Sequence, residues 1–112
     1  MYDTLAQLNK TTGVTGSMLV GDDGIVIAAD LNEKSDDEVL GALASSIAAT
    51  VRRSTSEMGG DEFSQITVEA DDQKIFLSDA GIGTLVVTTE PRVNIGLVRL
   101  EIRNAIGALQ NA

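Results

Sequence analysis

Apolar positions follow two periods along the chain, one typical of helices and one typical of strands. Apolar residues recur at helical spacing within residues 1–13, 32–60 and 90–110. Short runs that alternate with polar residues, or are rich in β-branched residues, occupy residues 14–20, 25–29, 63–70, 74–78 and 84–89. The pattern therefore predicts the order helix, two strands, long helix, three strands, long helix.

The sequence GDDG, residues 21–24, separates the first two predicted strands. It favours a hairpin turn, because Asp and Gly both tolerate positive φ. A calcium loop needs further acidic residues at alternate positions, and the residues that follow do not supply them. The Gly-rich segment 79–83 joins two strands and lacks the helix N-terminus that a phosphate cradle needs. Both segments are predicted to be turns rather than ligand sites.

The predicted helix of residues 32–60 begins with a capping box of Ser35 and Glu38 and ends at the glycine pair 59–60. Small residues permit either tight packing on the chain's own sheet or the close approach of a partner subunit. A solvated helix face normally carries long charged side chains instead. The apolar stripe of this helix comprises Leu40, Leu43, Ala44, Ile47 and Val51. The small residues on the rest of its surface include Ala42, Ser45, Ala48 and Ala49.

The later segments predict where their elements lie in the sheet and on its surface. The strand 63–70 has one polar face and is expected at an edge, whereas the apolar run 85–87 is expected mid-sheet with helices on both sides. Pro91 suits an early position in the final helix. That helix buries a stripe of Ile95, Val98, Ile102, Ala105, Ile106 and Leu109. On another face it groups Arg92, Arg99 and Arg103, as a solvated face or as a docking patch for an acidic partner.

Composition argues against several classes of function. The chain of 112 residues has no Cys and no His, which removes the usual zinc ligands and the Ser-His-Asp and Cys-His catalytic systems. Its net charge of −9 repels nucleic acid and anionic membrane. Two Phe, one Tyr and no Trp do not favour the roomy aromatic pocket of a small-ligand sensor. We expect no catalytic residues, no metal and no cofactor, and no membrane insertion. The start of the chain lacks signal-peptide features, so we expect a cytoplasmic protein.

Two separated segments, VTGSMLVGDDGIVIAAD (14–30) and NIGLVRLEIRNAIGAL (94–109), resemble the roadblock/dynein light chain family. The resemblance covers nearly the whole chain and implies a single roadblock-like domain over residues 1–112. It implies an α+β fold with three layers, α/β/α: a five-stranded antiparallel sheet with one long helix on one face and two helices on the other. The matching residues Asn94, Ile95 and Gly96 are expected to begin the last helix, with Gly96 permitting close packing.

The resemblance also implies a partner and a mode of assembly. Family members pair as homodimers, or with a related roadblock protein, through the long helix and the strand after it. Such members regulate or scaffold Ras-like small GTPases. The implied function is a dimeric, non-enzymatic module that binds and regulates a Ras-like small GTPase, with stimulation of GTP hydrolysis as one mode of regulation. The alternative is a nucleotide-independent scaffold subunit of a larger complex.

The site residues that accompany this function lie on the long helix and the following strand. For the dimer interface the expected residues are Ala42, Ser45, Ala48, Ala49, Gln65, Ile66, Thr67 and Val68. For the partner-binding surface they are Arg52, Arg53 and Glu57.

Overall fold

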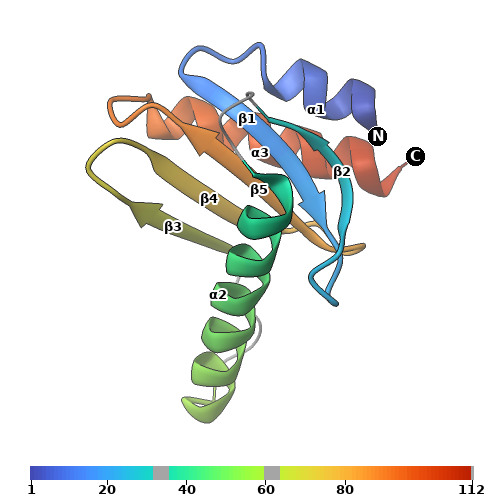
Figure 1. The fold of residues 1–112 in the computed structure, drawn as a ribbon, viewed down its shortest axis with the longest axis vertical. Coiled ribbons are helices and arrows are strands. Elements are labelled where there is room, and N and C mark those ends of the chain that lie inside the picture. Colours follow the sequence, from blue (N-terminus) through green and yellow to red (C-terminus); the bar gives the residue numbers. More distant parts are fainter. Residues whose placement is uncertain (32–35, 60–63, 112) are drawn as a thin grey trace.

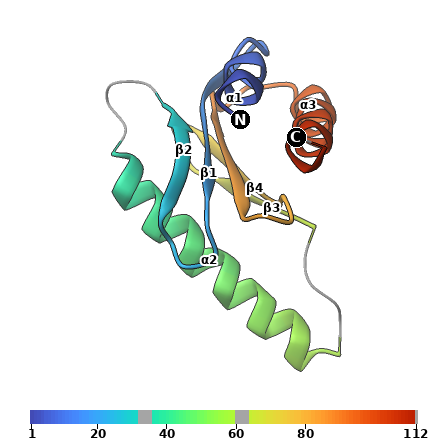
Figure 2. The same ribbon diagram turned by 90° about the vertical axis from the view of Figure 1, so that its right-hand side faces the viewer.

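Five antiparallel strands form one sheet between two layers of helices (Figure 1). The computed structural model describes residues 1–31, 36–59 and 64–111. In chain order the elements are α1 (Tyr2–Leu8), β1 (Val14–Val20), β2 (Val26–Asp30), α2 (Asp37–Glu57), β3 (Gln65–Glu69), β4 (Lys74–Asp79), β5 (Thr84–Thr89) and α3 (Ile95–Gln110). Figure 2 shows α2 on one face of the sheet and α1 and α3 on the other. The predicted fold class and layering are confirmed.

The strand order is β2-β1-β5-β4-β3, so β5 lies at the centre and β2 and β3 form the two edges. All six residues of β5 are buried, as expected of a strand that is covered on both faces. The predicted central and edge positions of these strands are therefore confirmed. The pairing of β1 with β5 brings the first and last parts of the chain together. The two chain ends lie on the same side of the sheet, because α1 and α3 pack beside each other there.

Alternation along the strands divides the core into two clusters. One lies under α1 and α3, where Leu19, Phe76, Leu85 and Val87 meet the helical residues Leu5, Leu8, Val98 and Ile102. The other lies under α2 and contains Met18, Val20, Leu77 and Val86 together with Ala44. The helix α2 covers β1, β2 and β5 and leaves much of the β3 and β4 face without a helix above it (Figure 1).

The first helix is shorter than its predicted segment. Leu5 and Leu8 are its buried residues, whereas the apolar residues Tyr2 and Ala6 of the same segment are exposed. The helix ends at Leu8 rather than near Gly13. Among the described helices, none is long and apolar enough to cross a membrane.

The caps of α2 and α3 differ in part from the sequence-based expectation. Asp36 caps α2, since its carboxylate accepts hydrogen bonds from the backbone amides of Glu38 and Val39 at 3.1 and 3.2 Å. The predicted capping residue Ser35 and the predicted stop at Gly60 lie outside the described residues.

The last helix begins later than predicted. Asn94 caps α3 by accepting from the amide of Leu97 at 3.1 Å, as its motif led us to expect. The expectation that Pro91 is an early helical residue is wrong, because it lies in the turn that is closed by the hydrogen bond from Val93 N–H to the carbonyl of Glu90.

The GDDG segment forms the β1–β2 hairpin turn, as predicted. Gly24 has a φ of +83°, and the amide of Gly21 donates to the carbonyl of Ile25 at 2.9 Å. Asp23 is part of the turn, because its side chain accepts from the amide of Ile25 at 3.0 Å. The acidic residues here shape backbone rather than form a ligand site.

Candidate partner-binding surfaces

The helix α2 lies close to the sheet because its contact residues are small. Gly41, Ala44 and Ala48 are the buried residues of this helix. A Cβ added at Gly41 would lie 3.1 Å from a methyl group of Val26, a contact tighter than most side chains make, so a larger residue would require Val26 to shift. Leu43 was expected in the buried stripe and is instead 55% exposed. Small residues here serve packing on the chain's own sheet.

Apart from Ala48, the predicted interface residues of α2 occupy a single flank of the helix.

 Ala42, Ser45 and Ala49 share this flank at helical spacing, and Ser45 lies beside Gly24 of the β1–β2 turn. Ala48 is a correction, because only 1% of its surface is exposed and it packs within its own chain. The structure therefore does not bring these small residues together with β3.

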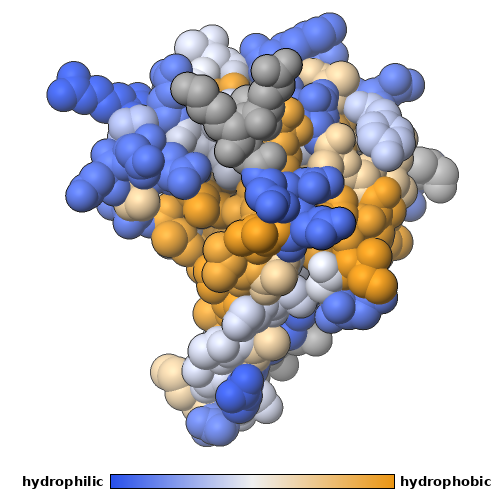
Figure 3. Space-filling view, in the orientation of Figure 1, coloured by the Kyte–Doolittle hydropathy of each residue, from blue (hydrophilic) through white to orange (hydrophobic). Residues whose placement is uncertain are grey.

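The opposite flank of α2 faces β3 and β4. Leu40 and Ile47 pack in the same cluster as Ile66, Val68 and Ile75 of those two strands. Leu43 lies between Leu40 and Ile47 on this flank and is exposed. Figure 3 shows the result as a band of apolar surface that runs beside α2, over β3 and β4. Sequence reasoning missed Leu43 as a surface residue, because its spacing also fits a buried stripe.

The edge strand β3 carries the other predicted interface residues. Gln65, Ile66, Thr67 and Val68 are all half-buried. Within the described part of the chain β3 pairs only with β4, so its second edge has no strand beside it. Its side chains alternate: Ile66 and Val68 face the α2 side, while the side chain of Gln65 faces the α3 side and donates to Ser78 Oγ at 3.2 Å.

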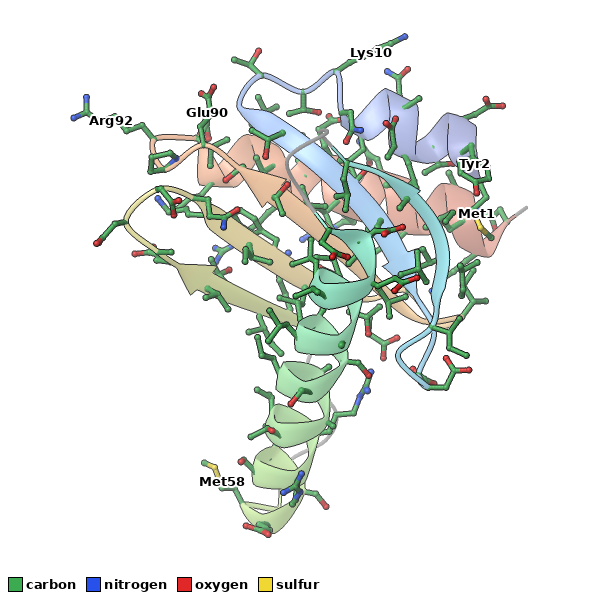
Figure 4. All side chains as sticks on the ribbon, viewed as in Figure 1. Met1, Tyr2, Lys10, Met58, Glu90 and Arg92 are labelled. Carbon is green, nitrogen blue, oxygen red and sulfur yellow. The ribbon has the colours of Figure 1, made fainter. Side chains whose placement is uncertain are left out.

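The C-terminal half of α2 extends past the sheet and carries the predicted partner-binding residues (Figures 1 and 2). Arg53 and Glu57 are exposed there, and Arg52 is half-buried. The helix ends with Met58 as its C-cap, at the tip of the projection in Figure 4, and 84% of that side chain is exposed. The fold thus places two arginines, a carboxylate and an apolar side chain on one projecting helix end.

The three C-terminal arginines are not one group, contrary to the prediction. Arg99 and Arg103 lie one turn apart on α3 and line an open hollow of about 710 Å³ between α3 and the β3 edge. Arg92 lies in the turn before α3 and points away from the molecule in Figure 4. Their separation follows from the late start of α3, which leaves Arg92 outside the helix.

The Gly-rich segment 79–83 connects β4 to β5 as a turn, as predicted. Asp79 Oδ1 accepts from the amide of Gly81 at 2.8 Å, so the turn already uses one of its own amides. No cluster of three or more metal-ligating side chains occurs within residues 1–31, 36–59 and 64–111. Gly96 was expected to permit close packing, and this is wrong, because it is exposed and an added Cβ would meet only Asn94, at 3.5 Å.

A protein of known sequence from an archaeon is similar to most of the chain. Uncharacterized protein MJ0714 from Methanocaldococcus jannaschii is 44% identical over 101 residues, which are 90% of this chain and 86% of that protein. Two solved structures share the fold. Myxococcus xanthus MglB superimposes with a TM-score of 0.91 at 24% identity, over 97% of this chain and 90% of that one. A Roadblock/LC7 domain from Streptomyces avermitilis gives a TM-score of 0.90 at 23% identity, over 99% and 95%.

The family model described as Roadblock/LC7 domain matches residues 1–89. This range contains the whole sheet together with α1 and α2, and therefore both surfaces that the dimer and partner predictions involve. The chain belongs to the Roadblock/LC7 family.

Proposed function

We propose that this chain is a dimeric, non-enzymatic module that binds and regulates a Ras-like small GTPase. The observation that carries the proposal is the apolar surface beside α2, which continues to the open edge of β3. Membership of the Roadblock/LC7 family supports the choice of partner, because the family resemblance implies regulators and scaffolds of such GTPases. A cytoplasmic location is part of this proposal, since such a GTPase draws on cytosolic GTP.

The dimer in this proposal joins two β3 edges and two α2 helices. An open edge strand with apolar neighbours is a liability for a monomer, and pairing it with a second copy removes that edge. The exposed Leu43 lies one helical turn from half-buried Ile47, which packs in the same cluster as Ile66, so a second α2 placed on this flank covers apolar surface. A related roadblock protein with a similar β3 edge is an equivalent partner.

Polar residues on this flank of α2 are compatible with such burial. Thr50 and Ser54 donate their hydroxyl hydrogen bonds to the carbonyls of Ser46 and Thr50, at 2.9 and 3.0 Å. A hydroxyl that already donates to its own helix keeps that hydrogen bond when an apolar surface covers it, so no unsatisfied donor is buried. These hydroxyl groups therefore do not prevent a second helix from packing on this flank of α2.

The GTPase in this proposal binds the projecting end of α2, through Arg52, Arg53 and Glu57. No described element covers this end, and arginine forms strong, geometrically specific hydrogen bonds with the carboxylates of a protein partner. The module acts by positioning the residues of the GTPase itself. We also treat residues 1–112 as one domain, because α3 lies beyond the family match and still packs its buried face on the same sheet.

A nucleotide-dependent capture experiment tests the partner. The purified protein is used as bait in cytosol of its source organism, with a non-hydrolysable GTP analogue or with GDP. We expect a small GTPase to be enriched with the GTP analogue, and a single-turnover assay with that GTPase then measures hydrolysis. The variant Arg53→Glu/Glu57→Lys is expected to lose the capture, whereas the control Glu90→Lys/Arg92→Glu, which also leaves the net charge unchanged at exposed positions, retains it.

Capture that does not depend on the nucleotide would point to a different function. Capture of the same proteins with both nucleotides, in a form that the α2 variant does not weaken, contradicts a nucleotide-reading regulator. That result supports the nucleotide-independent scaffold instead.

A further inference from the structure

The hollow between α3 and β3 holds an excess of positive charge in a chain whose net charge is −9. Among the residues that the structure describes, its charged lining residues are Arg99, Arg103 and Asp79. The carboxylate of Asp79 is engaged with the amide of Gly81. Among the described residues neither arginine has a hydrogen bond or an ion pair, and two like charges one helical turn apart repel each other. Among the described lining residues, one further carboxylate would balance the charge.

The dimer proposed above determines which carboxylate arrives there, and the present inference rests on that dimer. When two copies of one strand pair about a two-fold axis, the residue numbers of opposing residues have a constant sum. Opposing residues must also face the same side of the joined sheet, which makes this sum even. Centring β3 on Thr67 pairs all five of its residues, whereas any shift leaves residues at its ends unpaired.

This register places an acidic residue opposite the hollow. Ile66 then faces Val68 of the partner subunit on the α2 side, which keeps that side apolar. On the α3 side Gln65 faces Glu69 of the partner subunit, and Gln65 itself lines the hollow. Directly opposed side chains have Cβ atoms about 4.5–5.5 Å apart, so the partner's carboxylate lies at the mouth of the hollow.

Within the described part of its own chain, Glu69 has no charged group paired with its carboxylate. Its cross-strand neighbour is Lys74, and the ammonium group of Lys74 donates to the carbonyl of Pro91. Glu69 is exposed, and it forms no ion pair within the described part of the chain. It does not easily reach the hollow of its own chain, because Gln65 lies four positions away along the strand, a span of about 13 Å.

We propose that Glu69 of the partner subunit forms an ion pair with Arg99 and Arg103 across the β3–β3 junction. The two-fold axis creates this contact twice, once at each end of the paired strands. The two contacts fix the register of the strands, because a shift of two residues moves each carboxylate away from the arginines. They also make the α3 face of the joined sheet specific for partners that carry an acidic residue at this position.

A pair of complementary charge reversals tests this contact. In the homodimer of Glu69→Lys, each lysine meets two arginines, and in the homodimer of Arg99→Glu/Arg103→Glu, each Glu69 meets two glutamates. In a mixture of the two variants, the heterodimer has opposite charges at both contacts. We expect each homodimer to dissociate at least 10-fold more readily than the wild type, and the mixture to form almost only heterodimer in native mass spectrometry.

A matched pair controls for net charge. The variants Asp22→Lys and Lys10→Glu/Arg92→Glu make the same changes in net charge at exposed sites away from the hollow, and their mixture should approach the statistical 1:2:1 distribution. A 1:2:1 distribution for the test pair as well would overturn the ion pair. The wild type is measured first: if it sediments as a monomer at all concentrations, the dimer itself is refuted, whereas a wild-type dimer with statistical mixing refutes only the ion pair.

Discussion

Gly83 stands where the β4–β5 turn passes closest to the end of β1. A Cβ added at Gly83 would overlap the carbonyl oxygen of Val20, and backbone cannot move aside as a flexible side chain can. The turn is also closed by a hydrogen bond from the amide of Ala80 to the carbonyl of Gly83 at 2.8 Å. We expect Gly83→Ala to lower the free energy of unfolding by about 1–3 kcal/mol, measured by urea denaturation.

Gly107 provides the control for this substitution. It lies within α3, and no heavy atom lies within 4 Å of an added Cβ. Because alanine is the better helix former, Gly107→Ala should raise the free energy of unfolding by about 0.5–1 kcal/mol. Equal effects at both glycines would show that the close approach at Gly83 is not what excludes a side chain.

Asn94 belongs to the motif that marks the start of α3. Its side-chain oxygen accepts from the amide of Leu97, which otherwise has no partner in the first turn of the helix. Asn94→Ala should therefore reduce the free energy of unfolding by about 1 kcal/mol, whereas Asn94→Asp retains the acceptor and should stay within a few tenths. Urea denaturation of the three proteins checks this order, and an alanine variant as stable as the wild type would contradict it.

At the scale of elements, the order of helices and strands was predictable because each follows a clear period. The buried face of α2 was not predictable, because the hydrophobic pattern does not tell whether a glycine or alanine on a helix faces a sheet or solvent. Close approach to Val26 of β2 favours glycine at position 41, Ala44 is buried beside it on the same helix, and Leu43 faces outward. The hollow lined by Arg99 and Gln65 was also beyond the sequence, because only the strand order brings α3 beside the edge formed by β3.

Ala48 on α2 is buried within the chain, whereas Ile66 on β3 is half-buried at the sheet edge, so a charge should have different effects at the two positions. Ala48→Glu places a charge at a site that is buried within the chain, so it should destabilise the folded protomer itself. Ile66→Glu places the charge on the half-buried edge strand, so it should separate the proposed dimer and leave the protomer folded. Light scattering gives the mass, and circular dichroism gives the melting temperature. A dimer of unaltered mass for Ile66→Glu would contradict the assignment of this edge to the interface.

At the scale of the whole molecule, the two faces of the sheet have different roles in the proposed assembly. The α1 and α3 face is closed by its own core, and the α2 face is completed by a second copy. Two protomers with a charge of −9 each repel at long range, so the apolar contact must outweigh that repulsion. Salt screens it, and the Debye length is about 8 Å at physiological ionic strength.

Dimerisation of this kind makes the stability of the folded chain depend on protein concentration. If two unfolded chains form one folded dimer, each tenfold increase in concentration stabilises the dimer by about 1.4 kcal/mol, because association is linked to folding. We expect the melting temperature of the wild type to rise by about 6–11 °C from 2 to about 200 μM, because two tenfold steps add about 2.8 kcal/mol per dimer and a folded unit of the dimer's size gains on the order of 2–4 °C per kcal/mol. The monomeric Ile66→Glu variant should melt at one temperature throughout that range. A wild type whose melting temperature does not change with concentration, while scattering gives the mass of a monomer, would contradict assembly through the β3 edge.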